Sequence, residues 1–178
     1  MIGLKTDIVE LQEYTVEWEY AFQNEKSELI RQCGKYVYDI QHIGSTAIKG
    51  CIAKPIIDIG IAIIDFSEGY KIRDQLDPDL YNYKGEYGIS GRHYIEKGNK
   101  ELQTHHIHIF EKTNEHFKNH ILFRDYLIKH EEYIKEYCNL KKELILKYRN
   151  DREGYTESKN TFIKMILKKA NEEFKKGI

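Results

Sequence analysis

Hydrophobic and polar positions follow two different periods in the two parts of this chain. Up to residue 112, many apolar positions alternate with polar ones or form short continuous runs, as in β-strands. From Asn114 onward, apolar residues recur every three or four positions, as on amphipathic helices. Because strands precede helices, the order favours an α+β fold over a doubly wound sheet. We expect one domain over 1–178, with a mixed sheet and flanking helices in 1–112 and an all-helical cap in 113–178.

The same pattern places the individual elements. Strand character is predicted for five segments, namely 36–43, 56–64, 81–87, 92–97 and 104–110. Helical spacing is predicted for five others, namely 16–33, 68–76, 117–127, 134–148 and 162–174. Residues 44–54 are expected to form a loop or short helical turn between the first two strands.

One carboxylate, Asp58, lies in the middle of an isoleucine-rich strand. On that strand Ile57, Ile59, Ile61 and Ile63 share one face, which is typical of a core. Asp58 shares the other face with Gly60 and Ala62, and these small residues suggest that something approaches it. An unpaired carboxylate in an apolar sheet is costly, and a metal ion or a basic partner would remove that cost.

A Gly-Ser turn precedes this strand. Gly44 lets the backbone adopt positive φ and approach a ligand closely, while Ser45 and Thr46 offer hydroxyl and backbone donors to an anion. The layout resembles the nucleotidyltransferase superfamily, in which such a loop grips a triphosphate and two strand acids, one residue apart, hold Mg²⁺. This chain has Gly60 in place of the second acid, so the usual residues do not assemble a two-metal site.

Longer runs resemble the GrpB family. They are HIGSTAIKG (42–50), KPIIDI (54–59), THHIHIF (104–110), HILFRDYL (120–127), the R-x-Y-x-x-K run from Arg92 to Lys97, and the pair Tyr155 and Lys159. The similarity follows the chain in order over nearly its whole length. It implies a nucleotidyltransferase-like mixed β-sheet flanked by helices, followed by a helical segment.

Two histidines are candidate partners of Asp58. His106 and His108 alternate onto one face of their predicted strand, while His105 points to the other. If this strand neighbours the Asp58 strand, Asp58, His106 and His108 converge as a metal site that suits Mn²⁺, Fe²⁺ or Zn²⁺ better than Mg²⁺. A divalent ion such as Mg²⁺, Mn²⁺ or Zn²⁺ is therefore a candidate cofactor. Alternatively, the imidazoles form hydrogen bonds in a polar patch or contact a phosphate as cations.

Basic and polar residues elsewhere are candidate partners of an anionic ligand. They are His42, Lys54, Arg92, Lys97, Arg124, Lys141, Tyr155 and Lys159. Arg92 has a second interpretation as a structural ion-pair partner of Asp58. For the last three, a solvated helix face is the alternative. Arg124 and Asp125 are adjacent on a predicted helix, so their side chains are expected to point in different directions.

These residues predict a nucleotide or other phosphate-bearing ligand bound at Gly44, Ser45 and Thr46. Asp58 is then the candidate catalytic residue, and metal-dependent nucleotidyl transfer is one hypothesis. Two alternatives remain open. One is a non-catalytic nucleotide- or anion-binding module on the same fold. The other is a metal-dependent hydrolase that uses Asp58, His106 and His108.

Composition and charge narrow these choices only a little. The formal net charge of −1 gives no global argument for binding nucleic acid or a membrane surface. Residues 141–178 carry eleven Lys or Arg and six Asp or Glu, an excess that solvated helix faces would explain. Three scattered cysteines without a CxxC spacing indicate reduced thiols of a cytoplasmic protein. We expect no signal peptide, and no apolar run approaches the roughly 20 residues of a membrane span.

Overall fold

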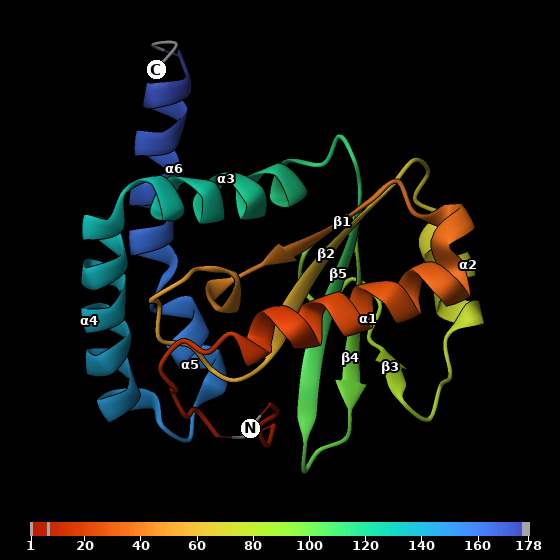
Figure 1. Cartoon of the computed structure of the whole chain (residues 1–178), viewed down its shortest axis with the longest axis horizontal. Coiled ribbons are helices and arrows are strands. Elements are labelled where there is room, and N and C mark those ends of the chain that lie inside the picture. Colours follow the sequence, from red (N-terminus) through yellow and green to blue (C-terminus); the bar gives the residue numbers. More distant parts are fainter. Residues whose placement is uncertain (1, 7, 176–178) are drawn as a thin grey trace.

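Five β-strands form one mixed sheet in the order β1-β2-β5-β4-β3 (Figure 1). The computed structural model describes residues 2–6 and 8–175. The strands are β1 (Asp39–Ile43), β2 (Ile57–Ile63), β3 (Tyr81–Tyr83), β4 (Arg92–Gly98) and β5 (Gln103–Glu111). β2 and β5 are parallel, and the other neighbouring pairs of this sheet are antiparallel.

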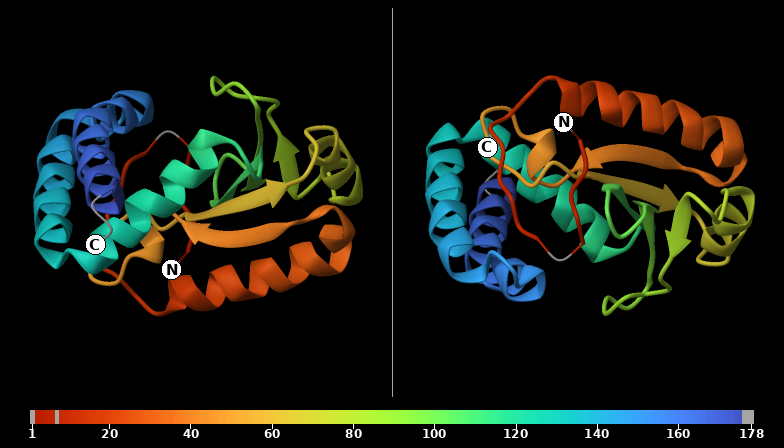
Figure 2. Two further views of the ribbon diagram at one scale, coloured as in Figure 1. Left: turned by 90° about the horizontal axis from the view of Figure 1, so that it is seen from above. Right: turned by 90° about the horizontal axis from the view of Figure 1, so that it is seen from below.

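Helices cover the sheet and extend beyond it. They are α1 (Glu17–Cys33), α2 (Glu68–Gln75), α3 (Glu115–Lys129), α4 (Glu131–Tyr148), α5 (Arg152–Glu157) and α6 (Asn160–Lys175), with 3₁₀ turns at Gly34–Tyr36 and Ser45–Ala47. Figure 2 shows α1 and α3 on opposite sides of β1 and β2. The predicted α+β fold with a C-terminal helical segment is confirmed.

Two local predictions need correction, and one short helix was missed. The strand predicted at 36–43 begins only at Asp39, because the 3₁₀ turn precedes it. The strand predicted at 81–87 ends at Tyr83, and the chain then turns through Gly85 and Tyr87, whose φ values are 67° and 46°. Helix α5 was not predicted, although the Asp151 side chain caps it by accepting from the Gly154 amide at 2.9 Å.

The isoleucine face of β2 is core, as predicted. Its four isoleucines pack with residues from α1 and α2 in one buried cluster that includes Trp18, Phe22, Leu29 and Ile72. Burial of this apolar area provides much of the free energy that holds α1 and α2 against the sheet.

On the opposite face of β2, Gly60 leaves room for α3. A Cβ at position 60 would lie 3.2 Å from the Phe117 ring and 3.3 Å from Ile43. Ala62 packs with Phe110 and Phe117 in a small apolar cluster. The group that approaches Gly60 and Ala62 is therefore the core side chain of Phe117.

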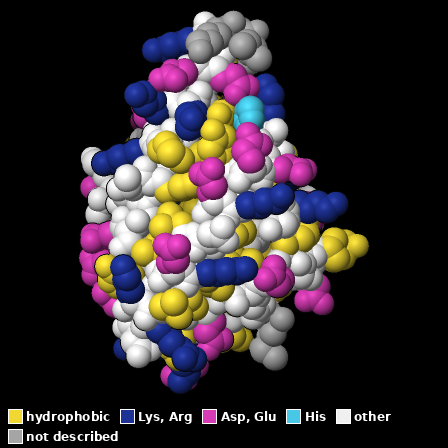
Figure 3. All heavy atoms as spheres, turned by 90° about the vertical axis from the view of Figure 1, so that its left-hand side faces the viewer, with side chains coloured by type: hydrophobic (Ala, Val, Ile, Leu, Met, Phe, Trp, Pro, Cys, Tyr) yellow, Lys and Arg dark blue, Asp and Glu magenta, His cyan; other side chains and the backbone are white. Residues whose placement is uncertain are grey.

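The cap formed by α3, α4, α5 and α6 has a core of its own. That core includes Ile48, Cys51 and Ile52 from the loop between β1 and β2, packed with Leu127 and Ile166 of the cap. Figure 3 shows the face on the α4 side, where basic and acidic side chains are interspersed with hydrophobic ones. Among the helices of the described residues, none is long and apolar enough to cross a membrane.

Candidate functional site

Strand pairing brings Asp58 beside two histidines. In the parallel pair, Asp58 lies opposite His106 and Gly60 lies opposite His108, so these side chains share one face of the sheet. Asp58 Oδ1 is 3.3 Å from His106 Nδ1 and 3.6 Å from His108 Nε2. His105 is paired with Ile57 on the other face, as the alternation predicts.

An arginine lies behind each of these histidines. Arg152 Nη2 is 3.1 Å from His106 Nε2, and Arg92 Nη1 is 3.3 Å from His108 Nδ1. A guanidinium only donates hydrogen bonds, so the ring nitrogens that face the arginines must accept. The proton of each neutral ring is then on the nitrogen nearer Asp58. Arg92 does not pair directly with Asp58, as one interpretation proposed, because His108 lies between them.

The charge states follow from these contacts. Burial opposes ionisation of Asp58, but attraction between its carboxylate and the facing rings of His106 and His108 outweighs it and holds the pKa of Asp58 well below its usual value. Burial lowers the pKa of His106, and Arg152 and Lys54 lower it further against the effect of Asp58. At neutral pH Asp58 is therefore ionised and faces a neutral imidazole at His106.

This donor set does not fit a metal ion held through the histidines. A metal ligand must turn a lone pair toward the ion, whereas the nitrogens of His106 and His108 that face Asp58 carry protons. Within the described ranges, no group of three or more His, Cys, Asp or Glu side chains is arranged to hold a metal ion. Of the predicted metal ligands, only Asp58 offers lone pairs at this position.

The Gly-Ser turn packs directly against Asp58. Gly44 has φ 69° and ψ −171°, a conformation that essentially only glycine adopts, and a Cβ there would collide with Asp58 Oδ2. Because successive Cα atoms are about 3.8 Å apart, Ser45 also lies within about 8 Å of the carboxylate. Gly44, Ser45 and Asp58 therefore border one site.

Lys141 of α4 fastens this loop to the cap. Its side chain is only 1% exposed, and its ammonium donates to Ser45 Oγ at 3.1 Å, Cys51 Sγ at 3.1 Å and the Ile52 carbonyl. The same ammonium lies 4.1 Å from the centre of the Tyr137 ring. Burial lowers the pKa of Lys141, which Cys51 partly opposes. A solvated helix face is therefore wrong for Lys141, which links the cap to the loop.

Two lysines flank the buried ring of Tyr155 near Asp58. Lys54 Nζ and Lys159 Nζ lie 5.7 Å and 4.6 Å from the ring centre, and neither ammonium has a hydrogen bond or ion pair with the described residues. Burial, with Arg152, lowers the pKa of Lys54 to about 8, although Asp58 opposes the shift. Burial, with Lys54, also lowers the pKa of Lys159 well below its usual value. The cluster thus holds more positive charge than Asp58 balances.

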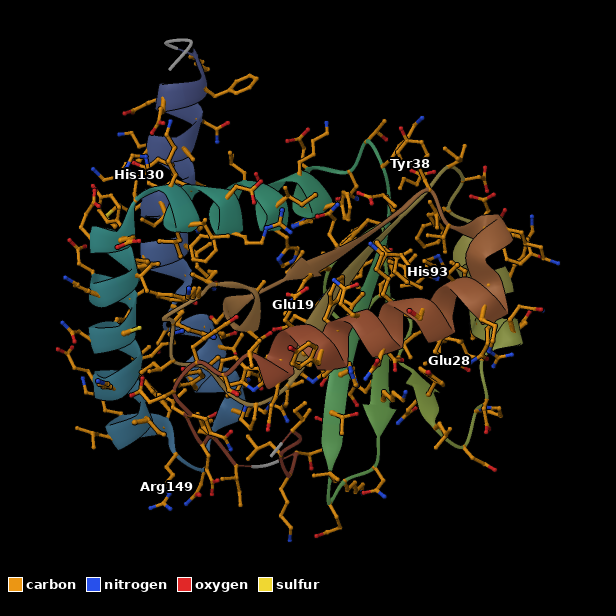
Figure 4. All side chains as sticks on the ribbon, viewed as in Figure 1. Glu19, Glu28, Tyr38, His93, His130 and Arg149 are labelled. Atoms are coloured by element: carbon orange, nitrogen blue, oxygen red, sulfur yellow. The ribbon has the colours of Figure 1, made fainter. Side chains whose placement is uncertain are left out.

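His42 and Thr46, two predicted ligand contacts, have partners within the protein. His42 lies opposite Ile59 on the isoleucine face, where its ring stacks on Phe22 with centroids 4.7 Å apart. Its Nε2 is 3.0 Å from Thr46 Oγ1, and its Nδ1 is 3.4 Å from the carboxylate of Glu19, a residue of α1 labelled in Figure 4. Thr46 is only 2% exposed. These contacts join α1 to the loop.

Lys97 and Arg124 are both held by other groups of the protein. Lys97 forms an ion pair with the buried carboxylate of Glu25 on the isoleucine side. Arg124 Nη1 donates to Gln41 Oε1 at 3.0 Å and to the His42 carbonyl at 2.8 Å. These two hydrogen bonds tie α3 to β1. Its Nε lies 2.7 Å from Asp125 Oδ1, so the expectation that these two side chains diverge is wrong.

Two residues of the site, Arg152 and His120, were not predicted. Arg152 precedes Tyr155 by three positions, a helical spacing that could have revealed it had α5 been recognised. His120 follows Phe117 by three positions on α3, and its ring centroid lies 5.5 Å from that of His108. Burial lowers the pKa of His120 to about 3, and His108 contributes to that shift.

Two surface hollows lie elsewhere on the molecule. One hollow of about 480 Å³ lies between residues 9–11 and 145–149, and another of about 440 Å³ lies beside residues 73–83. Neither of these two is lined by Asp58. The site is therefore defined by its charges and hydrogen-bond groups.

The chain is similar to known proteins over most of its length. A family model described as GrpB protein matches residues 8–169. The chain belongs to the GrpB family. It is 37% identical over 171 residues to the glutamate-rich protein GrpB of Alkalihalophilus pseudofirmus, covering 94% of this chain and 98% of that protein.

A second relative is longer than this chain. The UPF0157 protein YqkA of Bacillus subtilis (strain 168) is 38% identical over 169 residues, which are 95% of this chain but 49% of YqkA. This chain thus spans about half the length of that relative.

A solved structure shares the fold. The crystal structure of conserved protein GrpB from Enterococcus faecalis matches with a TM-score of 0.85 and 31% identity, over 93% of this chain and 99% of that one. The predicted family and the nucleotidyltransferase-like α+β fold are confirmed.

Proposed function

We propose that this GrpB protein binds the phosphate groups of a small molecule, with a nucleotide as the leading candidate, between the Gly44–Ser45 turn and α5. The observation that carries the proposal is the pair Lys54 and Lys159, whose partly buried ammonium groups have no partner in the described structure. Among the described residues, Asp58 is the one carboxylate that raises the pKa of both lysines. Phosphate oxygens would supply the missing negative charge as acceptors of charge-assisted hydrogen bonds.

The other residues of the site have supporting roles in this proposal. Asp58 Oδ2 has no hydrogen bond with the described residues and accepts one from a ligand hydroxyl. Lys141 holds Ser45 in position through the 3.1 Å contact to its hydroxyl. Tyr155, which is 1% exposed, provides an aromatic ring near both lysine ammonium groups.

Binding without nucleotidyl transfer is favoured by the surroundings of Gly60. The second strand carboxylate of a two-metal site would have to occupy space that Phe117 and Ile43 fill. The hydrolase alternative needs lone pairs from His106 and His108, and their contacts with arginine turn N–H groups toward Asp58 instead.

Isothermal titration calorimetry and thermal shift with ATP as the probe test the proposal. Replacing a charged donor to phosphate removes about 1.5–3 kcal/mol, so Lys159→Met should weaken ATP binding by roughly 10- to 100-fold. Lys164→Met is the matched control, because Lys164 is exposed on α6 and should leave binding unchanged.

A wild-type protein that shows neither heat nor a thermal shift with ATP, inorganic triphosphate or inorganic phosphate would overturn the proposal. Equal losses in Lys159→Met and Lys164→Met would also count against it, because they would indicate diffuse surface attraction. Phosphate or pyrophosphate release, measured on the same samples, separates binding from turnover.

A further inference from the structure

The arginines behind the two histidines suggest how the ligand is recognised. We propose that Arg152 and Arg92 fix the proton positions of His106 and His108, so that Asp58 serves as a hydrogen-bond acceptor for the ligand and lysines neutralise its phosphates in place of a divalent metal ion. This inference rests on the proposed function and specifies its ligand as a metal-free phosphate ester that carries a hydroxyl group.

Arg152 cannot turn away from His106. Its Nη1 donates to the Thr6 carbonyl at 3.0 Å and to Gln103 Oε1 at 2.9 Å, while Nη2 faces His106 Nε2 at 3.1 Å. The guanidinium is therefore held on two sides and presents an N–H to the imidazole. His106 must accept at Nε2, which places its own proton on Nδ1, 3.3 Å from Asp58 Oδ1.

Arg92 holds His108 in the same way. Its Nε and Nη2 donate to the carbonyls of Glu86 and Tyr87 at 3.2 Å and 2.6 Å, and its Nη1 faces His108 Nδ1 at 3.3 Å. The guanidinium also lies over the Tyr94 ring, 4.6 Å from its centre. These contacts place the His108 proton on Nε2, which points toward Asp58.

His108 Nε2 is an unused donor. It is a buried nitrogen without a hydrogen-bond partner among the described residues, and it stops 3.6 Å from Asp58 Oδ1. A buried N–H without a partner is unfavourable, and a ligand oxygen can satisfy it. The site thus offers an N–H donor beside the carboxylate acceptor of Asp58, a pair that matches a phosphate oxygen with a neighbouring hydroxyl.

The same groups disfavour a metal-chelated ligand. A divalent ion needs several oxygen or nitrogen lone pairs, whereas the site offers the ligand the N–H group of His108 and two ammonium groups. Mg²⁺ bound to ATP would also cancel charge that Lys54 and Lys159 need. We therefore expect ATP to bind at least as tightly in EDTA as in excess Mg²⁺.

Nitrogen NMR of the histidine rings tests the arginines directly. In the ligand-free protein near pH 7, His106 should be the Nδ1–H tautomer and His108 the Nε2–H tautomer. Arg152→Met should leave His106 as a mixture of tautomers. Arg149→Met is the control, since Arg149 is exposed at the end of α4, as its label in Figure 4 shows, and should change neither ring.

An Nε2–H tautomer at His106, or a doubly protonated ring, would overturn the proposal. So would Mn²⁺ binding that wild type shows and Asp58→Asn loses, or an ATP affinity more than tenfold higher with Mg²⁺ than in EDTA. If ATP binds under neither condition, the proposed function fails, and the tautomers still decide the role of the arginines. If Arg152→Met does not fold, the wild-type rings and the Arg92→Met variant give the answer.

Discussion

Two separate features of position 44 require glycine. Its backbone lies in a region that costs other residues roughly 1–3 kcal/mol, and its α-carbon lies against the Asp58 carboxylate. Gly50, in the same loop, also has a positive φ of 80°, but a Cβ there would meet nothing within 4 Å. The two glycines therefore allow backbone strain to be separated from contact with Asp58.

Urea unfolding of Gly44→Ala and Gly50→Ala should separate the two effects. Gly50→Ala carries backbone strain alone and should lose about 1 kcal/mol of unfolding free energy. Gly44→Ala adds a collision with Asp58 and should lose at least about 2 kcal/mol, together with ATP binding. Equal losses of stability and unchanged ATP binding would show that the close packing of the turn on Asp58 has no role.

Lys54 should make ligand binding depend on pH in an unusual range. Its pKa is lowered to about 8, chiefly by burial, and only the protonated ammonium attracts phosphate. Phosphate is fully ionised above its second pKa of about 6, so affinity should fall as pH rises above 8, by up to about tenfold per pH unit for each proton taken up.

Calorimetry with ATP in EDTA from about pH 7 to 9.5 measures this dependence. Lys54→Arg keeps its charge throughout, because guanidinium does not deprotonate in this range, and should reduce the slope. The remaining slope would come from Lys159, whose pKa is also lowered. An affinity that stays constant up to pH 9.5 in wild type would remove Lys54 from the binding site.

At the scale of single strands, the alternation of residues predicted which side chains share a face of a strand. It could not predict which residues of other strands lie opposite them. The face shared by His106 and His108 followed from the two-residue period, and so did the isoleucine face of β2. Antiparallel pairing places His42 and Lys97, two predicted ligand contacts, opposite Ile59 and His105 on the isoleucine side. Pairing partners depend on contacts distant in sequence, and a shift of one residue exchanges the faces.

Short elements and core contacts were also beyond the sequence pattern. Helix α5 has only six residues, fewer than two turns, so hydrophobic periodicity cannot show it. Arg152 was missed with it. Gly60 was interpreted as a sign that something approaches this face, but the sequence does not reveal that Phe117 of α3 packs there.

At the scale of the whole molecule, the positive charge of the C-terminal segment has a specific place. Lys141, Arg152 and Lys159 all come from this segment, and each lies near the loop or the histidines. The outer face near α4 instead mixes both signs of charge (Figure 3). The excess of basic residues is thus partly directed inward, whereas solvated helix faces were the simpler interpretation of the sequence.

Lys141 couples the cap to the loop. Replacing it should therefore weaken ligand binding, although Lys141 itself does not contact the ligand in this proposal. In Lys141→Met the side chain still fills most of the space, but Ser45 Oγ and the Ile52 carbonyl lose their donor. An unsatisfied buried acceptor costs about 1–3 kcal/mol, and a loop that is no longer preorganised binds more weakly. We expect lower stability and roughly tenfold weaker ATP binding.

Hydrogen exchange distinguishes this coupling from direct contact. In Lys141→Met the amides of residues 45–52 should exchange faster, while those of β2 and β5 stay protected. Lys142→Met is the control, because Lys142 is exposed on the same helix and should leave exchange and affinity unchanged. Weaker ATP binding with unchanged exchange would mean that Lys141 contacts the ligand itself. Unchanged binding with faster exchange would show that the order of the loop does not limit affinity, because the lysines beside Tyr155 would then hold the phosphates alone.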